Sequence, residues 1–337
     1  MGKSGSHAEN HGSTGSLTEV RMRRARRIGI ALTAAAIVVC GSGCSTATDA
    51  ASAQLCDEPS STPTVEDPST RPLAFSSNRA DSFDLWLMGA DGTDPVQLTT
   101  ADGVEGMASW SPDGTQLLFL SAVDTESNGD VCVINADGTG LKNLTSTPDV
   151  YETTPSWSPD GSEIVYGTWK GKAHELHVMD STGKRSHRIT SNGNWPSWSP
   201  DGELIVFSAS RGSSAQDLWT VNRDGSDKAL LADGDSELTE PAWSPDGRTI
   251  AYVSVGSEET EEDIFIMPAG GGSDRRVAAL PGNDHWPPAW SPDSMQLAFT
   301  ADGTDLVGEI VVVDLRTRET TNLTNHESHD AFPAWRQ

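Results

Sequence analysis

Positive charge is what this sequence has least of. Its 337 residues include 23 Lys and Arg against 49 Asp and Glu, which gives a formal net charge of −26 at pH 7. A surface this acidic repels phosphate backbones and anionic lipid headgroups, so we expect no nucleic-acid partner and no direct binding to lipid headgroups. The same charge favours cationic and basic partners, although it also suits a very soluble surface without a dedicated ligand.

Cysteine is nearly absent, with four residues in the whole chain. Two of them, Cys40 and Cys44, lie at the end of an N-terminal leader, and the other two are Cys56 and Cys132. In an oxidising compartment an even pair of cysteines favours a disulfide. We therefore predict a Cys56–Cys132 bridge that fixes the segment near Cys56 to the body of the protein.

Long hydrophobic runs are also missing. The apolar run from Ile28 to about Cys40 is too short to span a bilayer comfortably, but it has the length of a signal-peptide core and follows five arginines. It predicts export. Residues 1–20 are polar and rich in Gly and Ser, so the start of the natural chain is either Met1 or Met22.

The end of the leader resembles a lipoprotein cleavage site. Gly43 precedes Cys44 as a lipobox requires, whereas Cys40 and Gly41 depart from its usual pattern. Lipidation of Cys44 is the favoured prediction, with plain secretion as the alternative. We expect the protein on the outer face of the cytoplasmic membrane, held only by the lipid anchor, or secreted.

Composition divides the chain into three parts. Residues 1–44 form the N-terminal extension and signal peptide, and residues 45–71 are rich in Ala, Ser, Thr and Pro. Such a composition does not bury a core, so the second part is expected to be a disordered tether. The remaining residues, 72–337, are expected to form the folded domain.

Tryptophan is abundant, and most of it belongs to a repeat. The chain has 11 Trp, and Trp-Ser-Pro-Asp recurs five times, four times followed by Gly. Six motif tryptophans, one truncated after its Trp, are spaced by 47, 41, 45, 47 and 45 residues: Trp110, Trp157, Trp198, Trp243, Trp290 and Trp335. Each interval holds three further short apolar runs, which predicts four strands per repeat and matches the length of a β-propeller blade.

The repeated motif predicts a turn instead of an active site. Pro presets φ for the first turn position, Asp favours turn geometry and Gly supplies the positive φ that closes the turn. One large aromatic plate per repeat suits packing between adjacent blades. The motif Asp residues are therefore expected to be structural.

These residues resemble the TolB-type, WD40-like β-propeller repeat over about residues 72–337. The resemblance implies an all-β fold with six four-stranded antiparallel blades. Residues 72–99 lack a Trp strand, and the segment ending at Trp335 has only that strand. We expect the C-terminal strand to pair with the first blade and close the ring. No Gly-x-Ser-x-Gly elbow is present, unlike in prolyl-peptidase relatives that add a hydrolase domain to a similar propeller.

Residues preceding each motif Trp differ between repeats and are expected to enter the central channel. Several are acidic, imidazole or aromatic side chains at matching heights, which predicts a ligand site at the channel mouth. The candidates are Glu105, Glu152, His285 and Asp330 five residues before Trp, Tyr151 and His329 six before, and Trp195 and Glu240 three before. An acidic hydrated funnel without a ligand is the alternative.

Three functions remain open from the sequence. The favoured one is an exported, monomeric, non-catalytic propeller that binds a protein, peptide or envelope glycan at its acidic channel face. The second resembles oligogalacturonate lyase, a propeller enzyme with a metal in the channel mouth. It would use His285, His329, Glu105 and Glu152 with a divalent cation, calcium or manganese. The third is a structural role in assembly of the envelope. No cofactor is required by the favoured function.

Overall fold

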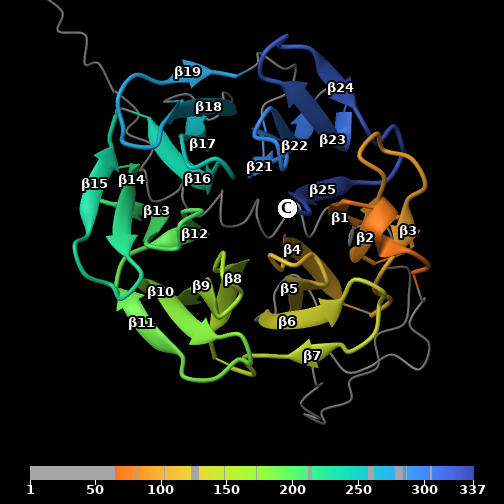
Figure 1. Ribbon diagram of the computed structural model, residues 1–337, viewed down its shortest axis with the longest axis horizontal. Helices are drawn as coiled ribbons and strands as arrows, with labels where there is room; N and C mark the ends of the chain where they lie inside the picture. Colours follow the sequence, from red (N-terminus) through yellow and green to blue (C-terminus); the bar gives the residue numbers. More distant parts are fainter. Residues whose placement is uncertain are drawn as a thin grey trace, which may run out of the picture.

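The computed structural model describes residues 65–337 apart from short gaps. The gaps are residues 81, 102, 123–128, 148, 172, 212–214, 235, 257–261, 278–283, 286 and 304–305, and the side chains of 284–285, 302–303 and 306–307 are not described either. Six antiparallel sheets are arranged radially around one axis, as Figure 1 shows. This six-bladed β-propeller confirms the predicted fold.

Each blade has four strands, apart from one that is interrupted. Blade 1 consists of β25 (Asp330–Trp335), β1 (Leu73–Ser77), β2 (Asp84–Met88) and β3 (Val96–Gln97). Blade 2 consists of β4 (Val104–Trp110), β5 (Gln116–Ala122), β6 (Asp130–Asn135) and β7 (Lys142–Asn143). Blade 3 consists of β8 (Tyr151–Trp157), β9 (Glu163–Lys170), β10 (Ala173–Asp180) and β11 (His187–Thr190).

The second half of the ring repeats this order. Blade 4 consists of β12 (Asn194–Trp198), β13 (Leu204–Ser210), β14 (Gln216–Asn222) and β15 (Ala229–Ala232). Blade 5 consists of β16 (Glu237–Trp243), β17 (Thr249–Val255), β18 (Glu262–Pro268) and β19 (Arg275–Arg276). In blade 6 the inner strand is divided into β20 (Asp284–His285) and β21 (Ala289–Trp290), followed by β22 (Gln296–Gly303), β23 (Leu306–Asp314) and β24 (Thr320–Asn322).

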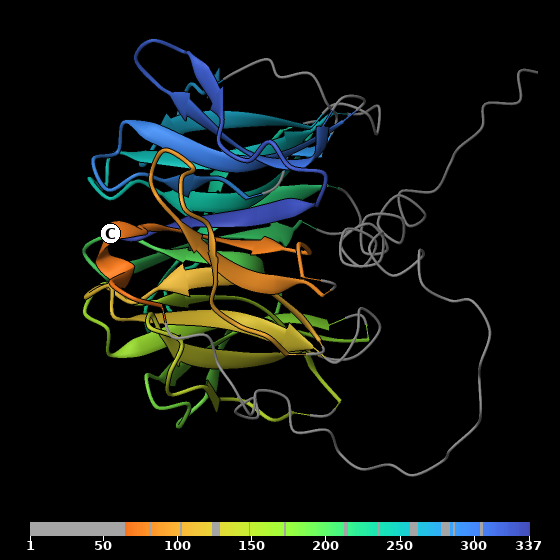
Figure 2. The same ribbon diagram turned by 90° about the vertical axis from the view of Figure 1, so that its right-hand side faces the viewer.

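The ring closes as the repeat pattern predicts. Strand β25 pairs antiparallel with β1, with Leu73 opposite Trp335 and Ser77 opposite Asp330. The chain end, marked C, lies near the axis in Figure 1 and at one face of the disc in Figure 2. Closure leaves neither side of blade 1 without a neighbouring blade.

Successive residues of a strand face opposite neighbouring blades. In β5, Leu117 and Phe119 join the core between blades 1 and 2, whereas Leu118 and Leu120 join the core between blades 2 and 3. Both faces of every sheet are therefore covered, which explains why polar and apolar residues alternate only weakly along these strands. The motif tryptophans lie in these cores, each against the preceding blade, as in the case of Trp110 against Ala334.

The repeated motif forms the turn between the first and second strands of a blade. In blade 2 the Ser111 hydroxyl donates to Asp113 at 2.7 Å and accepts the Gln116 backbone N–H at 2.9 Å. The same Ser–Asp bond occurs in blades 3 to 6, at 2.6–2.7 Å. These bonds hold the pKa of Asp113 and its counterparts below the usual range. The motif is scaffold, and its Asp is occupied as a turn residue.

The ordered contacts begin earlier than residue 72. Val65 is buried in the core between blades 1 and 2 and donates its N–H to the Asp137 carbonyl at 3.1 Å. A 3-10 turn at Pro68–Thr70 follows. The end of the expected tether thus contacts the domain, through the buried Val65 side chain and through hydrogen bonds of its backbone, such as that of the Pro68 carbonyl with Arg336. Within the residues that the structure describes, no helix is long and apolar enough to cross a membrane.

Cys132 lies fully buried in the same core as Val65 and is disulfide-bonded. Its predicted partner Cys56, like the lipidation candidate Cys44, lies outside the described residues. The Cys56–Cys132 pairing therefore stays a prediction.

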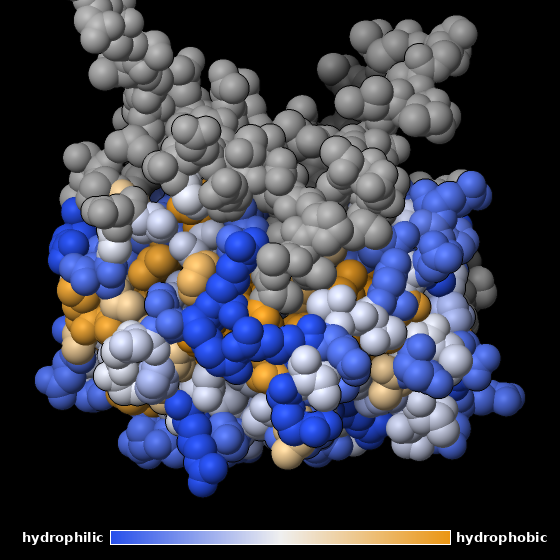
Figure 3. All heavy atoms as spheres, turned by 90° about the horizontal axis from the view of Figure 1, so that it is seen from above, coloured by the Kyte–Doolittle hydropathy of each residue, from blue (hydrophilic) through white to orange (hydrophobic). Residues whose placement is uncertain are grey.

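The part of the rim that faces the viewer in Figure 3 is mainly hydrophilic where it is described. Over blades 5 and 6, Figure 3 shows charged and polar residues with small apolar groups between them. Among the described residues, the only exposed large apolar side chains are those of Leu230 and Met295, with exposed fractions of 40% and 60%. This rim offers no extended apolar patch in the part of the chain that the structure describes.

Candidate functional site: a cavity on the propeller axis

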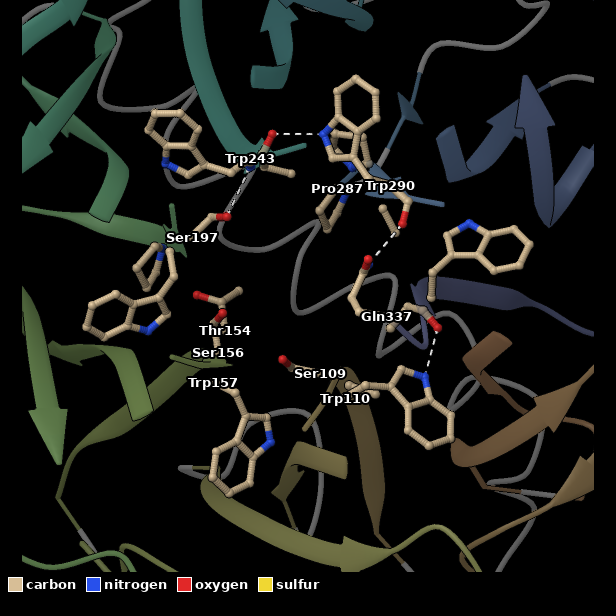
Figure 4. Close-up of a pocket in the computed structure, with 18 of the residues that line it drawn as sticks. Ser109, Trp110, Thr154, Ser156, Trp157, Ser197, Trp243, Pro287, Trp290 and Gln337 are labelled. Atoms are coloured by element: carbon tan, nitrogen blue, oxygen red, sulfur yellow. Dashed lines mark hydrogen bonds between the residues drawn. The ribbon is translucent and has the colours of Figure 1, made fainter. Parts of the chain in front are cut away.

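The inner strands enclose a cavity of about 460 Å³ on the axis of the ring. Every blade contributes to its wall through the residues around its motif Trp (Figure 4). The turn prolines Pro112, Pro159, Pro200 and Pro245 also line it, which places it toward the face of the disc that carries the motif turns. Gln337 lines the cavity too, and its side-chain amide donates to the Trp290 carbonyl at 3.2 Å.

A strained residue occurs at the same place in five inner strands. Three residues before the motif Trp, the backbone has a positive φ, although none of these residues is Gly: Met107 (55°), Thr154 (40°), Trp195 (54°), Glu240 (56°) and Phe332 (54°). The pairing register shifts at this point in each strand. A positive φ costs a non-Gly residue on the order of 1–3 kcal/mol, so the surrounding fold must impose it.

The bulge turns different side chains toward the axis. A β-bulge re-aims the side chains next to it, and the residue at this position lines the cavity in every blade. In blade 6 the position is Pro287, whose ring fixes φ near −65° and excludes the left-handed conformation. The inner strand of that blade is accordingly broken between His285 and Ala289. We call these six positions the bulge ring: Met107, Thr154, Trp195, Glu240, Pro287 and Phe332.

The two halves of the cavity differ in chemistry. Directly before the motif Trp, blades 2 to 4 carry Ser109, Ser156 and Ser197, which with Thr154 form what we call the hydroxyl arc. Blades 5, 6 and 1 carry Ala242, Ala289 and Ala334 at the same position. Figure 4 shows the labelled hydroxyl groups on one side of the opening and Pro287 on the other. The wall is otherwise mainly tryptophan and proline, which suits an apolar ligand with a few polar contacts.

Two predicted carboxylates lie between blades instead of in this cavity. Glu105 and Glu152 are 0% and 1% exposed and are absent from the cavity wall. Burial raises the pKa of each to about 8, against a partial lowering by Thr99 and Thr147, respectively. Both side chains belong to interfaces with the preceding blade, so they do not converge with the other acids on one space.

The remaining residues of the predicted funnel have separate environments. Asp330 is fully buried and forms an ion pair with Arg79. His329 makes an edge-to-face contact with Phe83, with the ring centroids 5.8 Å apart. Tyr151 packs edge-on against Trp169 at 6.5 Å. None of the three lines the cavity.

Two predicted residues, Trp195 and Glu240, do line the cavity, both from the bulge ring. The side chain of His285 is not described. Among the described residues no group of three His, Cys, Asp or Glu side chains lies close enough to hold a metal ion. The three described members of the lyase-like donor set, Glu105, Glu152 and His329, do not form such a group. The predicted divalent cation stays untested.

The sequence contains a positional pattern at the bulge ring that the amino-acid composition does not reveal. Residues at the third position before Trp differ in every repeat, while the next position is Pro in five of six repeats. A variable residue beside a repeated Pro marks a position outside the repeated packing pattern. The bulge itself was not predictable, because Met, Thr, Trp, Glu and Phe give no sequence signal for positive φ.

Fold and cavity together define a six-bladed propeller with an axial pocket. The sequence matches the family described as the TolB beta propeller domain over residues 60–245 and 222–337, and the chain belongs to this family. A comparison with curated protein sequences finds no match.

Several solved structures have the same fold. TolB from Acinetobacter baumannii is 19% identical with a TM-score of 0.69, and the match covers 81% of this chain and 68% of that chain. A manganese complex of oligogalacturonate lyase is 15% identical with a TM-score of 0.54, covering 76% and 74%. A chain in a nidogen/laminin complex is 10% identical with a TM-score of 0.63, covering 79% and 98%. At these identities the likeness concerns the fold.

Proposed function

We propose that this protein is an exported, monomeric, non-catalytic propeller that binds a segment of a protein or peptide in its axial cavity. One observation carries the proposal: a pocket of about 460 Å³ is lined by all six blades and is rich in tryptophan and proline. Its volume lies within the range of specific ligand sites, about 300–1,000 Å³. The propeller fold of a chain in the nidogen/laminin complex agrees with a role in protein binding.

Five strained backbones around the cavity support a binding role over a purely structural one. The positive φ at Met107, Thr154 and Phe332 destabilises the native state, yet the fold keeps it at positions that line the cavity. Strain of this kind clusters at ligand sites. We therefore propose the bulge ring as the ligand site, instead of the acidic funnel expected at Glu105 and Glu152.

Selection from a displayed library of random dodecapeptides on the full-length protein tests this function. Ser156→Trp fills the cavity from its wall, and Ser273→Trp adds the same side chain at an exposed loop of blade 5. Selected peptides should lose binding to the first variant and keep it for the second. A pool that binds both variants equally, or an empty pool, would exclude a peptide site in the cavity, and enrichment on a glycan array would indicate a glycan ligand.

Metal-assisted glycan processing is the alternative function. It rests only on the likeness of the fold to that of oligogalacturonate lyase. Thermal unfolding with EDTA and then with calcium, manganese or zinc tests for a cation, because a ligand of the folded state raises its midpoint. A metal-dependent rise of the unfolding midpoint that is lost in His285→Ala, together with turnover of uronate oligomers, would favour the enzyme over the non-catalytic binder.

Export and lipidation at Cys44 form the cellular part of the proposal. Mass spectrometry of the membrane-bound protein should find a diacylated N-terminal cysteine. In Cys44→Ala the protein should leave the membrane fraction, whereas an unmodified wild-type protein in the medium would indicate simple secretion.

A further inference from the structure

The axial cavity opens at the end that carries the motif turns. Of the described residues that line it, those that are exposed lie at that end: Pro112, Pro200 and Gln337. None of the six bulge-ring residues is exposed, and Glu240 and Phe332 are only 2% and 4% exposed. No described residue that precedes the bulge ring in its inner strand lines the cavity. The bulge ring is therefore the floor of a blind pocket whose mouth lies at the motif turns.

The floor consists of side chains that pack across the gaps between inner strands. Phe332 and Met107, from neighbouring blades, belong to one apolar cluster. The Phe332 ring also covers Gly106, where an added Cβ would lie 3.7 Å from its Cδ2 atom. Trp195 reaches the ring from blade 4, on the opposite side of the axis (Figure 1). A ligand therefore enters and leaves through the same mouth.

The cavity is too narrow for a loop. Five residues of inner strand separate the bulge from the turn Pro, a path of about 16 Å, so the 460 Å³ correspond to a mean cross-section of about 30 Å². An inserted loop places two chains side by side, and at the usual spacings of strands and sheets these need about 100 Å² with their side chains. A single chain needs about half of that area, and less where its side chains are small. The geometry thus admits one chain instead of two.

A single inserted side chain would leave the cavity mostly empty. A cavity of about 150 Å³ already holds a benzene ring in a protein, and this cavity is about three times as large. One aromatic side chain from a passing loop would leave much of the Trp and Pro wall without contacts, which forfeits dispersion energy. Several consecutive residues of one chain are needed to fill the space.

Polar groups at the floor and wall suit the backbone of such a chain. The Thr154 hydroxyl is buried and has no hydrogen-bond partner among the described residues. Ser156 is half-buried beside it, and both belong to the hydroxyl arc. Hydroxyl groups both donate and accept hydrogen bonds. They therefore suit the N–H and C=O groups of an inserted chain as well as the polar group at its end.

Carboxylates surround the mouth of the cavity. Each motif Pro is followed by an exposed Asp: Asp113, Asp160, Asp201, Asp246 and Asp293. Hydrogen bonds from the motif Ser and the turn backbone hold the pKa of each below the usual range, so all are ionised at neutral pH. Three arginines offset part of this charge: Arg223, Arg248 and Arg336. The excess of carboxylates favours the approach of a terminal amine over that of a terminal carboxylate.

We infer that the cavity receives one end of a partner's polypeptide chain, which enters from the motif-turn face and stops at the bulge ring. This inference rests on the proposed function and specifies which part of a peptide is bound. Both ends of a chain have the shape that the pocket requires. The carboxylates at the mouth lead us to expect the amino end.

Three displayed libraries of random dodecapeptides test the inference on the full-length protein. The first leaves the amino end free, the second leaves the carboxyl end free, and the third holds both ends between folded domains. Peptides count as cavity-bound when Ser156→Trp abolishes their binding and Ser273→Trp does not. Such peptides should come from the first library, whereas a pool from the second alone would support an inserted chain end of the opposite direction.

The third library separates the inference from the proposed function. If it yields cavity-bound peptides as readily as the others, the inference is overturned and the proposed function stands. If none of the three libraries yields a cavity-bound peptide, both are overturned.

Extension of a selected peptide probes the floor without changing the protein. Adding Gly-Ser-Gly-Ser to the inserted end should lower the affinity about 30-fold or more, the loss of one central anchor, and adding it to the other end should change it less than about twofold. Equal tolerance of the two additions would contradict a chain end stopped at the bulge ring.

A change of the floor provides a matched pair of variants. Trp195→Ala deepens the pocket, whereas Trp219→Ala removes a half-buried Trp of the same blade that does not line the cavity. The loss of affinity caused by one added Gly at the inserted end should shrink by about 10-fold on Trp195→Ala and stay the same on Trp219→Ala. The same loss on both variants would show that the chain end does not reach the floor.

Discussion

Arg79 and Asp330 form a two-pronged ion pair between a half-buried guanidinium and a fully buried carboxylate, with Nη2–Oδ2 at 2.6 Å and Nε–Oδ1 at 3.2 Å. The two residues are 251 positions apart, and the pair joins the β1–β2 loop to the strand that closes the ring. The guanidinium also lies 5.4 Å from the Phe75 ring centroid. One side-chain contact thus reinforces the pairing between β25 and β1.

Removing either partner should destabilise the protein strongly. We expect Arg79→Met and Asp330→Asn each to lower the free energy of unfolding by about 3–5 kcal/mol, because each leaves a buried polar group or charge uncompensated. The double variant should lose clearly less than the sum. Urea unfolding of the four proteins measures the coupling, and strictly additive losses would show that the pair is not coupled.

Buried acids should make stability depend on pH. Burial raises the pKa of Glu105 and Glu152 to about 8, above the value in the unfolded chain. The folded state then holds these protons more tightly, so their contribution to stability is complete below about pH 4.5 and is lost as pH rises toward about 8. Each group adds up to about 1.4 kcal/mol per pH unit to this slope.

Glu105→Gln and Glu152→Gln should therefore flatten the loss of stability between pH 5 and pH 8. Gln substitution at the exposed Glu203 is the control and should leave the slope unchanged. Urea midpoints at half-unit pH steps provide the measurement. If the wild type and both buried variants have parallel profiles, these carboxyl groups titrate normally in the folded state.

Substitution by Phe should destabilise the protein to different extents at two of the motif tryptophans. The Trp110 indole donates to the Ala334 carbonyl at 3.1 Å across the blade 1–blade 2 interface, whereas the buried Trp157 indole has no partner among the described residues. We expect Trp110→Phe to destabilise by about 1 kcal/mol more than Trp157→Phe, the typical net value of a hydrogen bond. Chemical denaturation of both variants is the measurement, and equal losses would refute an energetic role for the indole bond.

Relieving the strain of one bulge should stabilise the fold. Thr154 has φ 40°, a conformation in which a β-branched residue is unfavourable and Gly is not. Thr154→Gly should raise the free energy of unfolding by about 0.5–1.5 kcal/mol. Thr153→Gly, one residue earlier and without positive φ, should lower it. A loss of stability in both variants would mean that the Thr154 side chain contributes more than its backbone costs.

The predicted disulfide has a direct test. Peptide mapping of the full-length protein under non-reducing conditions should find Cys56 joined to Cys132. Two free thiols, or a bridge from Cys132 to another cysteine, would contradict the pairing.

The periodic residues revealed the fold, because a propeller repeats its scaffold. Trp110 and its counterparts predicted the inner strands, the inter-blade packing and the closure through Trp335. The repeat pattern did not predict which side chains near the axis point into the cavity. Glu105 and Glu240 are both acidic and close to a motif Trp, yet one is buried between blades and the other lines the cavity, because Glu105 precedes the bulge of its strand and Glu240 lies in the bulge of its own. Val65 shows the same limit, since one apolar residue in a polar tether carries no periodic signal.

Pairing of β25 with β1 also sets an order of events during biosynthesis. Blades 2 to 5 consist of consecutive strands, so each has all its residues as soon as its fourth strand has emerged. Blade 1 must wait until residues 330–335 have been made, and if the chain is exported unfolded, until they have crossed the membrane. During that interval β1 presents an unpaired edge, and such an edge invites association with other chains. Protection by a chaperone would matter most for β1, and a chain cut short before Asp330 would keep that edge open.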